Sequence, residues 1–282
     1  MIMKKIILSI ATVAALVLTA QTSDAQIKLP PASSTQTITQ GLGINNVKLS
    51  YQRPNIKGRV VFGELVPFGQ VWRTGANNIP SITFEEEVSI EGHKVPAGTY
   101  GIFSIPNKNE WTIILSKNST QWGAYQYKQE EDFLRFQVKP TALTNKVESF
   151  TMNFEDITTN SAKLTLAWDK TQVGFNIVVD QTKEIMASIE QAMKGEKKPY
   201  FQAAQYYFNN NLDIKKAAEW ANAADQGNTG APHIKYWKSL ILNKAGDKAA
   251  AKKAAQEGIE MAKKANNPEY IKLNTQALNS IK

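Results

Sequence analysis

The chain changes character at Asp180, and this change constrains the fold more than any other feature. Before Asp180, short apolar runs alternate with turn residues, and no helical periodicity interrupts them. After Asp180, the sequence is rich in alanine, and its apolar residues recur at helical spacing to the end. The sequence therefore predicts a β-domain over residues 26–180 and an α-helical domain over residues 181–282.

The first domain is predicted to contain about ten short strands. Turns such as Glu91-Gly92-His93 and Asp169-Lys170 separate them, and a Pro/Ser/Thr-rich lead, Leu29–Thr37, precedes them. Short strands with no helix between them are typical of an antiparallel β-sandwich or jelly-roll, which is the predicted fold. The main predicted strands are 47–51, 82–84, 88–90, 100–105, 111–115, 133–138, 149–154, 163–168 and 173–178.

The second domain contains an internal repeat. The segments that begin at Asp213 and Asp247 are similar and lie 34 positions apart, which is the tetratricopeptide period. The coinciding pairs are Ala203 with Trp237, Tyr207 with Ile241, Ala217 with Ala251, and Ala221 with Ala255. The full tetratricopeptide signature is missing, so a tetratricopeptide-like array of helical hairpins is the prediction and an irregular bundle is the alternative. After a first helix that ends near Gly195, the predicted helices are 199–210, 213–224, 232–245, 247–265 and 268–281.

The N-terminus has the features of a secretory signal peptide over residues 1–25. A positive pair, Lys4 and Lys5, precedes the apolar run Ile6–Ala20, and Ser23-Asp24-Ala25 is a small-x-small cleavage site. A retained membrane anchor is the alternative, but the run is shorter than the roughly 20 residues of a spanning helix. The chain has no cysteine, which excludes lipid anchoring, disulfides and thiolate metal sites. We expect a periplasmic or secreted protein, cleaved near Ala25, that is not a lipoprotein and has no integral membrane segment when mature.

The composition and the few histidines limit the function classes. The formal net charge is +8, but much of the excess lies in lysines of the C-terminal helices, and export argues against a nucleic-acid partner. His93 and His233 are more than a hundred residues apart, so a histidine-based catalytic or metal site is not predicted. The run Glu85-Glu86-Glu87 offers carboxylates to a cation, but such runs are more typical of solvated strand edges. We predict no metal site and no cofactor, no catalytic residue is identified, and the prediction leans away from an enzyme.

The stretch Pro67–Asn78 carries the strongest local signal, because glycines and aromatics are interleaved there with polar residues. It predicts an ordered loop that bends at Gly69 and Gly75, is anchored by Phe68 and Trp72, and presents Arg73 and Asn77. The planar fork of Arg73 suits a carboxylate or phosphate, and Asn77 suits a sugar or peptide. The alternative is that both side chains satisfy loop carbonyls while Trp72 fills the core.

Two further groups of residues add to this candidate site. Arg53, Lys57 and Arg59 lie upstream and bring positive charge, and Trp122-Gly123-Ala124-Tyr125 is a second aromatic loop. Exposed aromatic rings stack on sugar rings, although plugging the end of the sandwich is a commoner role. The candidate ligand-binding residues are Arg53, Arg59, Trp72, Arg73, Asn77, Trp122 and Tyr125.

The combined order of these pieces resembles one family. The pieces are Tyr51-Gln52-Arg53-Pro54, Lys57-Gly58-Arg59, Phe62-Gly63, Leu65-Val66-Pro67-Phe68-Gly69, Val71-Trp72-Arg73-Thr74-Gly75-Ala76-Asn77, Pro96-Ala97-Gly98-Thr99-Tyr100 and Trp122-Gly123. Over about Gln36–Asp180 the chain is similar to the domain of unknown function 2911. The resemblance implies exported envelope proteins of Gram-negative bacteria, often with helical repeats after the β-domain. It implies no accepted activity, so no catalytic residue follows from it.

Three functions are compatible with the sequence. The first is a non-catalytic binding protein, in which the sandwich presents the Arg73 loop and the helical hairpins bind a protein or peptide partner. The second is a glycan-binding or glycan-processing sandwich that uses Trp72, Trp122 and Tyr125. The third is a hydrolase-type enzyme that holds an anionic substrate with Arg73.

Overall fold

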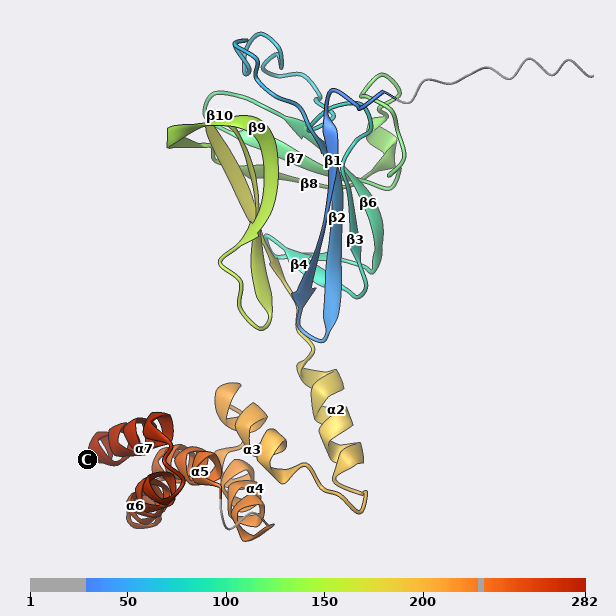
Figure 1. Ribbon diagram of the computed structural model, residues 1–282. Helices are drawn as coiled ribbons and strands as arrows, with labels where there is room; N and C mark the ends of the chain where they lie inside the picture. Colours follow the sequence, from blue (N-terminus) through green and yellow to red (C-terminus); the bar gives the residue numbers. More distant parts are fainter. Residues whose placement is uncertain (1–28, 228–230) are drawn as a thin grey trace, which may run out of the picture. The chain divides into compact units, whose positions relative to one another are not determined.

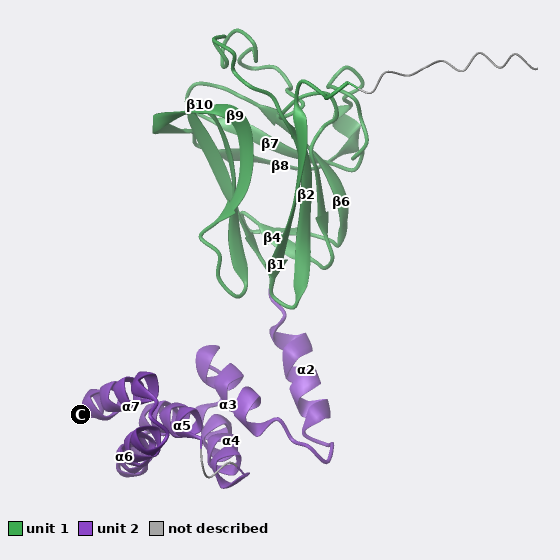
Figure 2. Ribbon diagram, in the orientation of Figure 1, with its two compact units in different colours: residues 1–179 green, residues 180–282 purple. Residues whose placement is uncertain are grey.

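The computed structural model of the protein describes residues 29–227 and 231–282 (Figure 1). The predicted signal peptide, residues 1–25, and its cleavage site near Ala25 lie outside the described residues. The chain divides after Val179 into two compact units (Figure 2).

The first unit consists of two antiparallel β-sheets, so the predicted sandwich is confirmed (Figure 1). The strands are β1 (Ser34–Leu42), β2 (Asn45–Arg53), β3 (Ser81–Phe84), β4 (Val88–Ile90), β5 (His93–Val95), β6 (Gly98–Ile105), β7 (Trp111–Ser116), β8 (Asp132–Val138), β9 (Thr141–Glu155) and β10 (Ser161–Val178). One sheet has the order β1-β2-β3-β6-β7-β8 and the other β5-β4-β10-β9. Alternate residues of both sheets, such as Leu49, Ile82 and Phe175, are fully buried in a shared core.

Hydrogen bonds between β2 and β9 join the two sheets. The Tyr51 hydroxyl donates to the Met152 carbonyl (3.0 Å), and these residues are 101 positions apart in the sequence. Nε of Arg53 donates to the Phe150 carbonyl (3.1 Å) across a separation of 97 positions. The seam between the sheets therefore depends on contacts between distant parts of the chain.

Two parts of the strand prediction are wrong. The Pro/Ser/Thr-rich lead was expected to extend to Thr37, but β1 begins at Ser34 and pairs with β2 along its whole length. This edge strand is mostly exposed and polar, so it lacks the apolar alternation that marks the other strands. The turn expected at Asp169-Lys170 is a bulge inside the continuous strand β10, where Asp169 has a φ of 53° and the register against β9 shifts.

The second unit contains six helices within the described part of residues 180–282, and the predicted C-terminal array of packed helices is confirmed (Figure 1). The helices are α2 (Thr182–Ala192), α3 (Tyr200–Asn209), α4 (Ile214–Gly227), α5 (Pro232–Ala245), α6 (Lys248–Lys264) and α7 (Pro268–Ser280). From α3 onward each helix packs against the next one, and α7 also packs against α5.

The 34-residue repeat corresponds to equivalent positions in this array. The Asp213 carboxylate accepts a hydrogen bond from the Lys216 backbone N–H (3.2 Å) at the start of α4. The Asp247 carboxylate accepts from the Ala250 N–H (3.0 Å) at the start of α6, so the two helices have the same N-terminal cap. The repeated alanines Ala217, Ala251, Ala221 and Ala255 are all buried.

A buried ionic network joins α4, α5 and α6. Nζ of Lys235 lies 2.8 Å from the Asp225 carboxylate and 2.6 Å from that of Glu257, and Nζ of Lys238 lies 2.8 Å from Asp225. Burial alone would raise the pKa of Asp225, but hydrogen bonds from Lys235 and Lys238 outweigh burial and hold that pKa below its ordinary value. Burial lowers the pKa of Lys235, but hydrogen bonds to Asp225 and Glu257 outweigh this effect and raise it.

Candidate functional site

The stretch Pro67–Asn78 forms the ordered loop that the sequence predicts. Gly69 and Gly75 bend it at positive φ values of 74° and 143°. Trp72 exchanges two backbone hydrogen bonds with Ser104 of β6 (2.7 and 3.0 Å), and the Thr74 hydroxyl lies 2.9 Å from the Ser104 hydroxyl. Arg73 is therefore held between two anchored neighbours.

The backbone around Arg73 is strained. Lys57, Thr74 and Asn77 have positive φ values of 50°, 52° and 53° although none is a glycine. Thr74 is also β-branched and fully buried, which makes this conformation an outlier for its residue type. Such strain costs on the order of 1 kcal/mol or more per residue, and it clusters at functional sites.

A hollow of about 350 Å³, here called the cationic hollow, lies beside this loop. Its charged lining residues are Lys57, Arg59 and Arg73, and Asn77 adds a neutral amide. None of its lining residues is an acid or a histidine. The other lining residues are Ala32, Ser33, Pro54, Asn55, Leu65, Val66, Trp72, Gly75, Ala76 and Trp168.

The hydrogen bonds at the cationic hollow leave one nitrogen of Arg73 without a partner in the described part of the chain. Nε of Arg73 is buried and has no hydrogen-bond partner among the described residues. Arg59 donates from Nε to the Ile56 carbonyl (2.9 Å) and from its terminal nitrogen to the Asn55 carbonyl (2.7 Å), so its position is fixed while its charge is not neutralised. The Glu148 carboxylate accepts from the Lys57 backbone N–H (2.9 Å) but does not line the hollow. The hollow is therefore suited to an anion.

A second hollow of about 410 Å³, here called the aromatic hollow, adjoins the first. The two hollows share four lining residues, Leu65, Val66, Trp72 and Arg73. Tyr125 lines the aromatic hollow and is 80% exposed. Arg73 thus lies on the boundary of a cationic and an aromatic surface.

The Trp122–Tyr125 loop is fixed to the Arg73 loop by backbone hydrogen bonds. The Gly123 N–H donates to the Asn77 carbonyl (2.7 Å), and the Ile79 N–H donates to the Gln121 carbonyl (3.1 Å). Trp122 is 63% exposed, and its ring stacks on that of Tyr125 with a centroid distance of 5.9 Å and an interplanar angle of 21°. The loop holds two large rings in solvent rather than plugging the sandwich with them.

Tyr127 supports this loop from the protein side. Its ring packs on Phe103 (5.0 Å between centroids), and its hydroxyl donates to the Asp132 carboxylate (2.8 Å). Burial, followed by this hydrogen bond, raises the pKa of Tyr127 and keeps its hydroxyl protonated. The loop that carries the exposed rings of Trp122 and Tyr125 is therefore followed by a residue with fixed contacts.

The remaining two sequence-predicted residues have structural contacts. The guanidinium group of Arg53 donates hydrogen bonds to β9, to the Phe150 carbonyl and to the Thr151 hydroxyl (3.1 and 2.9 Å). Arg53 lines neither hollow. Trp72 is 8% exposed and stacks on Trp168 within the core, although both hollows reach its surface. The structure brings together Arg59, Arg73 and Asn77 with Lys57, and it places Tyr125 and Trp122 beside them.

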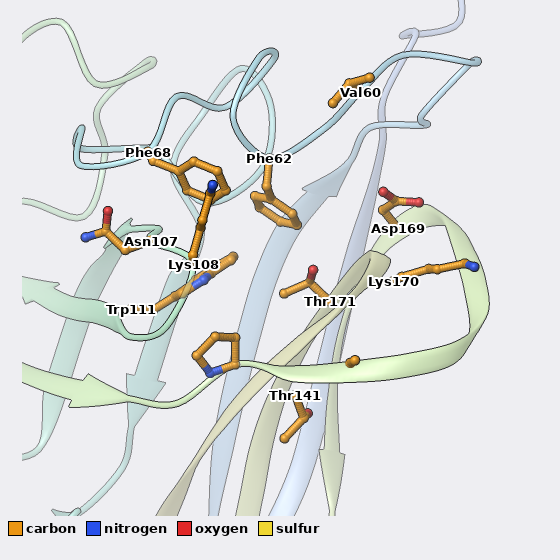
Figure 3. Close-up of a pocket in the computed structure, with 12 residues that line it drawn as sticks. Val60, Phe62, Phe68, Asn107, Lys108, Trp111, Thr141, Asp169, Lys170 and Thr171 are labelled. Atoms are coloured by element: carbon orange, nitrogen blue, oxygen red, sulfur yellow. The ribbon is translucent and has the colours of Figure 1, made fainter.

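A third hollow, which the sequence did not indicate, lies next to the bulge at Asp169 (Figure 3). It measures about 390 Å³, and Phe62, Phe68 and Trp111 contribute its aromatic side (Figure 3). Lys108, Asp169 and Lys170 give it charges of both signs, and Asp169 also lies 3.8 Å from Nζ of Lys146. We call it the bulge hollow; it combines mixed charge with an apolar wall.

The other polar candidates are engaged elsewhere. Glu85 accepts from the Asn46 N–H (2.8 Å), Glu87 pairs with Lys94 (2.9 Å), and His233 lies between the rings of Phe201 and Tyr270. Within residues 29–227 and 231–282, no group of three or more His, Asp or Glu is placed to hold a metal ion. Over the same ranges, no helix is both long and apolar enough to cross a membrane.

Comparison with known proteins gives one result. Residues 33–177, which are the β-sandwich, match the family described as protein of unknown function (DUF2911). Neither the curated proteins nor the solved structures include a significant match. The match covers more than half of the chain, and the six described helices follow it. The chain therefore belongs to the DUF2911 family, whose function is unknown.

Proposed function

We propose that this protein is an exported, non-catalytic binding protein of the periplasm or the outside medium, and that its sandwich binds an anionic ligand in the cationic hollow. One observation carries the proposal: three cationic side chains line a hollow with no lining carboxylate, and Nε of one of them, Arg73, is buried without a partner. Three positive charges with no carboxylate among the lining residues attract an anion to the hollow.

The lining of the hollow favours binding over catalysis. General acid–base catalysis uses a histidine or a carboxyl group within hydrogen-bond reach of the reacting atoms. Neither the cationic nor the aromatic hollow has an Asp, Glu or His among its lining residues. This composition supports a carrier or sensor of an anion over a hydrolase that holds its substrate with Arg73.

Replacing Arg73 by alanine is expected to weaken anion binding. Inorganic phosphate and sulfate, titrated into the full chain by calorimetry, should bind the wild type about 10- to 100-fold more tightly than Arg73→Ala, since charge-assisted hydrogen bonds contribute about 1.5–3 kcal/mol. Arg73→Lys should recover only part of the affinity, because an ammonium cannot form the bidentate fork.

The matched control is Lys108→Ala, which removes one positive charge from the bulge hollow. This variant should bind phosphate as the wild type does. If Arg73→Ala and Lys108→Ala weaken binding equally, the effect is one of net charge and the proposed site is wrong. If Arg73→Ala instead melts well below the wild type, Arg73 has a structural role.

A second proposal concerns the helical unit, which we expect to bind a protein or peptide. The supporting observation is a run of half-buried aromatic contacts across the first helices of successive hairpins and α7. Phe201 of α3 contacts His233 of α5 (5.3 Å), which contacts Tyr270 of α7 (6.0 Å), which contacts Tyr236 (6.4 Å). Arrays of helical repeats use such continuous faces to bind extended partners.

A photoreactive phenylalanine at position 236 tests this second proposal. In envelope extract it should form a crosslink to a protein partner, because the Tyr236 ring is part of the aromatic run. The same group at Lys252, an exposed position of α6, serves as the control. Equal crosslinking from both positions would argue against a specific face.

A further inference from the structure

The cationic and aromatic hollows are neighbours on one surface, because they share the lining residues Leu65, Val66, Trp72 and Arg73, and we call the two together the groove. The charge is concentrated at one end, where Lys57 and Arg59 lie beside Arg73. The other end, the aromatic hollow, has the larger volume and bears Tyr125. A ligand that reaches both ends needs an anionic group next to a flat, largely uncharged body.

The aromatic end offers a ring face rather than an enclosed apolar pocket. Tyr125 is 80% exposed, and Trp122 stacks on it in a loop that the Gly123–Asn77 hydrogen bond fixes. Two large rings held in solvent are unusual for a soluble protein and indicate a contact surface. Aromatic side chains carry a large apolar face and, in tyrosine, a polar edge, which suits the C–H face and hydroxyl edge of a sugar ring.

The uncharged polar residues of the groove fit the same body. Asn77 lines the cationic end and Gln70 lines the aromatic end. Each side-chain amide offers a donor and an acceptor, which are the groups that recognise sugar hydroxyls.

We infer that the groove binds an anionic saccharide, a sugar that carries a carboxylate or a phosphate, with its acidic group on Arg73, Lys57 and Arg59 and its ring on Tyr125. This inference rests on the proposed anion site and names the class of its ligand. It assigns the two loops that the sequence singled out to a single ligand. The anion is held by charge-assisted hydrogen bonds, and the ring is held by the aromatic face.

The test uses the full chain and six probes: glucuronate, glucose 6-phosphate, glucose, acetate, inorganic phosphate and uridine monophosphate. Glucuronate should bind about 2- to 13-fold more tightly than acetate, the fold-change that corresponds to the roughly 0.5–1.5 kcal/mol of a ring contact. It should also bind more tightly than glucose, which has the ring but no charge. Comparison of glucuronate with glucose 6-phosphate identifies which acidic group is preferred. Binding should weaken with salt, because the groove attracts its ligand by charge.

Four variants separate the two ends of the groove. Tyr125→Ala should reduce glucuronate affinity to that of acetate and leave acetate unchanged, whereas Tyr125→Phe should bind glucuronate nearly as the wild type does. Arg73→Ala should weaken both ligands. Lys108→Ala, in the bulge hollow, should weaken neither. Tyr125 is on the surface, so its replacement should not unfold the protein, and a loss of affinity can be assigned to the missing ring.

The outcomes distinguish the inference from the proposal on which it rests. If phosphate binds through Arg73 but glucuronate and glucose 6-phosphate bind no more tightly than acetate and phosphate, the saccharide inference is wrong and the anion site stands. If uridine monophosphate binds more tightly than the sugar acids and depends on Tyr125, the ligand is a nucleotide and the inference is overturned. If no anion binds, both are wrong.

Discussion

Replacing Gly101 by alanine is expected to lower the free energy of unfolding of the sandwich by about 3 kcal/mol, near the upper end of the effects of overpacking. Gly101 lies in β6, where the segment after β7 crosses it. A Cβ atom there would lie 2.4 Å from the Asn118 carbonyl oxygen and 2.5 Å from Cδ1 of Ile79. The carbonyl belongs to the backbone and cannot rotate away. Urea unfolding followed by tryptophan fluorescence measures the loss.

Gly41→Ala is the matched control, because Gly41 lies in β1 of the same sheet and no atom lies within 4 Å of the position that its Cβ atom would take. It should leave stability unchanged or raise it by a few tenths of a kcal/mol, since alanine restricts the unfolded chain. Equal unfolding midpoints for the two variants would contradict the close approach at Gly101. The shifted segment leads to Trp122, so Gly101→Ala should also disturb the aromatic end of the groove.

Asp225→Ala is expected to destabilise the helical unit by about 3 kcal/mol, because removing one member of a buried ion pair leaves its partner charge uncompensated. Asp225 and Lys235 are both 8% exposed, and Asp225 is the carboxylate that Lys235 and Lys238 share. Thermal unfolding followed by far-ultraviolet circular dichroism reports on the helices. Adding Lys235→Met should recover part of the loss, since the buried ammonium is then absent.

The same network predicts an acid dependence. The pKa of Asp225 is lower in the folded than in the unfolded state, so its contribution is complete above the ordinary aspartate pKa of about 4 and is lost as the pH falls through the lowered value. Asp225→Ala should flatten this part of the stability profile. Replacing Glu260, whose pair with Lys263 is exposed, should change neither stability nor its pH dependence by more than about 0.5 kcal/mol. If the loss of stability at acid pH is the same in Asp225→Ala as in the wild type, the pH dependence arises from other groups.

The fold could be predicted where local signals are strong. The helices begin at residues such as Asp247 or Pro268 that favour a helical N-terminus, and the structure places them within a few residues of the predicted ends. The loop at Arg73 was predictable because Gly69 and Gly75 permit its positive φ values. In both cases the determining interaction lies within a few residues of the chain.

The errors have the opposite origin. β1 is a polar edge strand, and its only reason to be extended is the pairing with β2 that the fold supplies. Asp169-Lys170 has the composition of a turn, but β9 continues alongside and holds the chain extended through a bulge. The tertiary partner overrides the local preference in both segments.

The candidate site shows the same division. Arg73, Asn77 and Tyr125 could be selected by residue type, but the sequence does not show that their two loops are joined, as they are by the hydrogen bond from Gly123 to Asn77 across forty-odd positions. Arg53 was selected for its charge, but its nitrogens donate hydrogen bonds to β9. The bulge hollow depends on Asp169, where the sequence indicated a turn, so it had no sequence signal.

The seam between β2 and β9 has a consequence for the order in which the molecule forms. Its bonds join residues 101 and 97 positions apart, so the ends of a long loop must meet before the two sheets can close on their core. Such non-local topologies fold in milliseconds to seconds, whereas helical arrays with local contacts fold in microseconds to milliseconds. A folding chain would thus acquire its helical hairpins first, while its sandwich strands remain open to chaperones and to the edges of other chains.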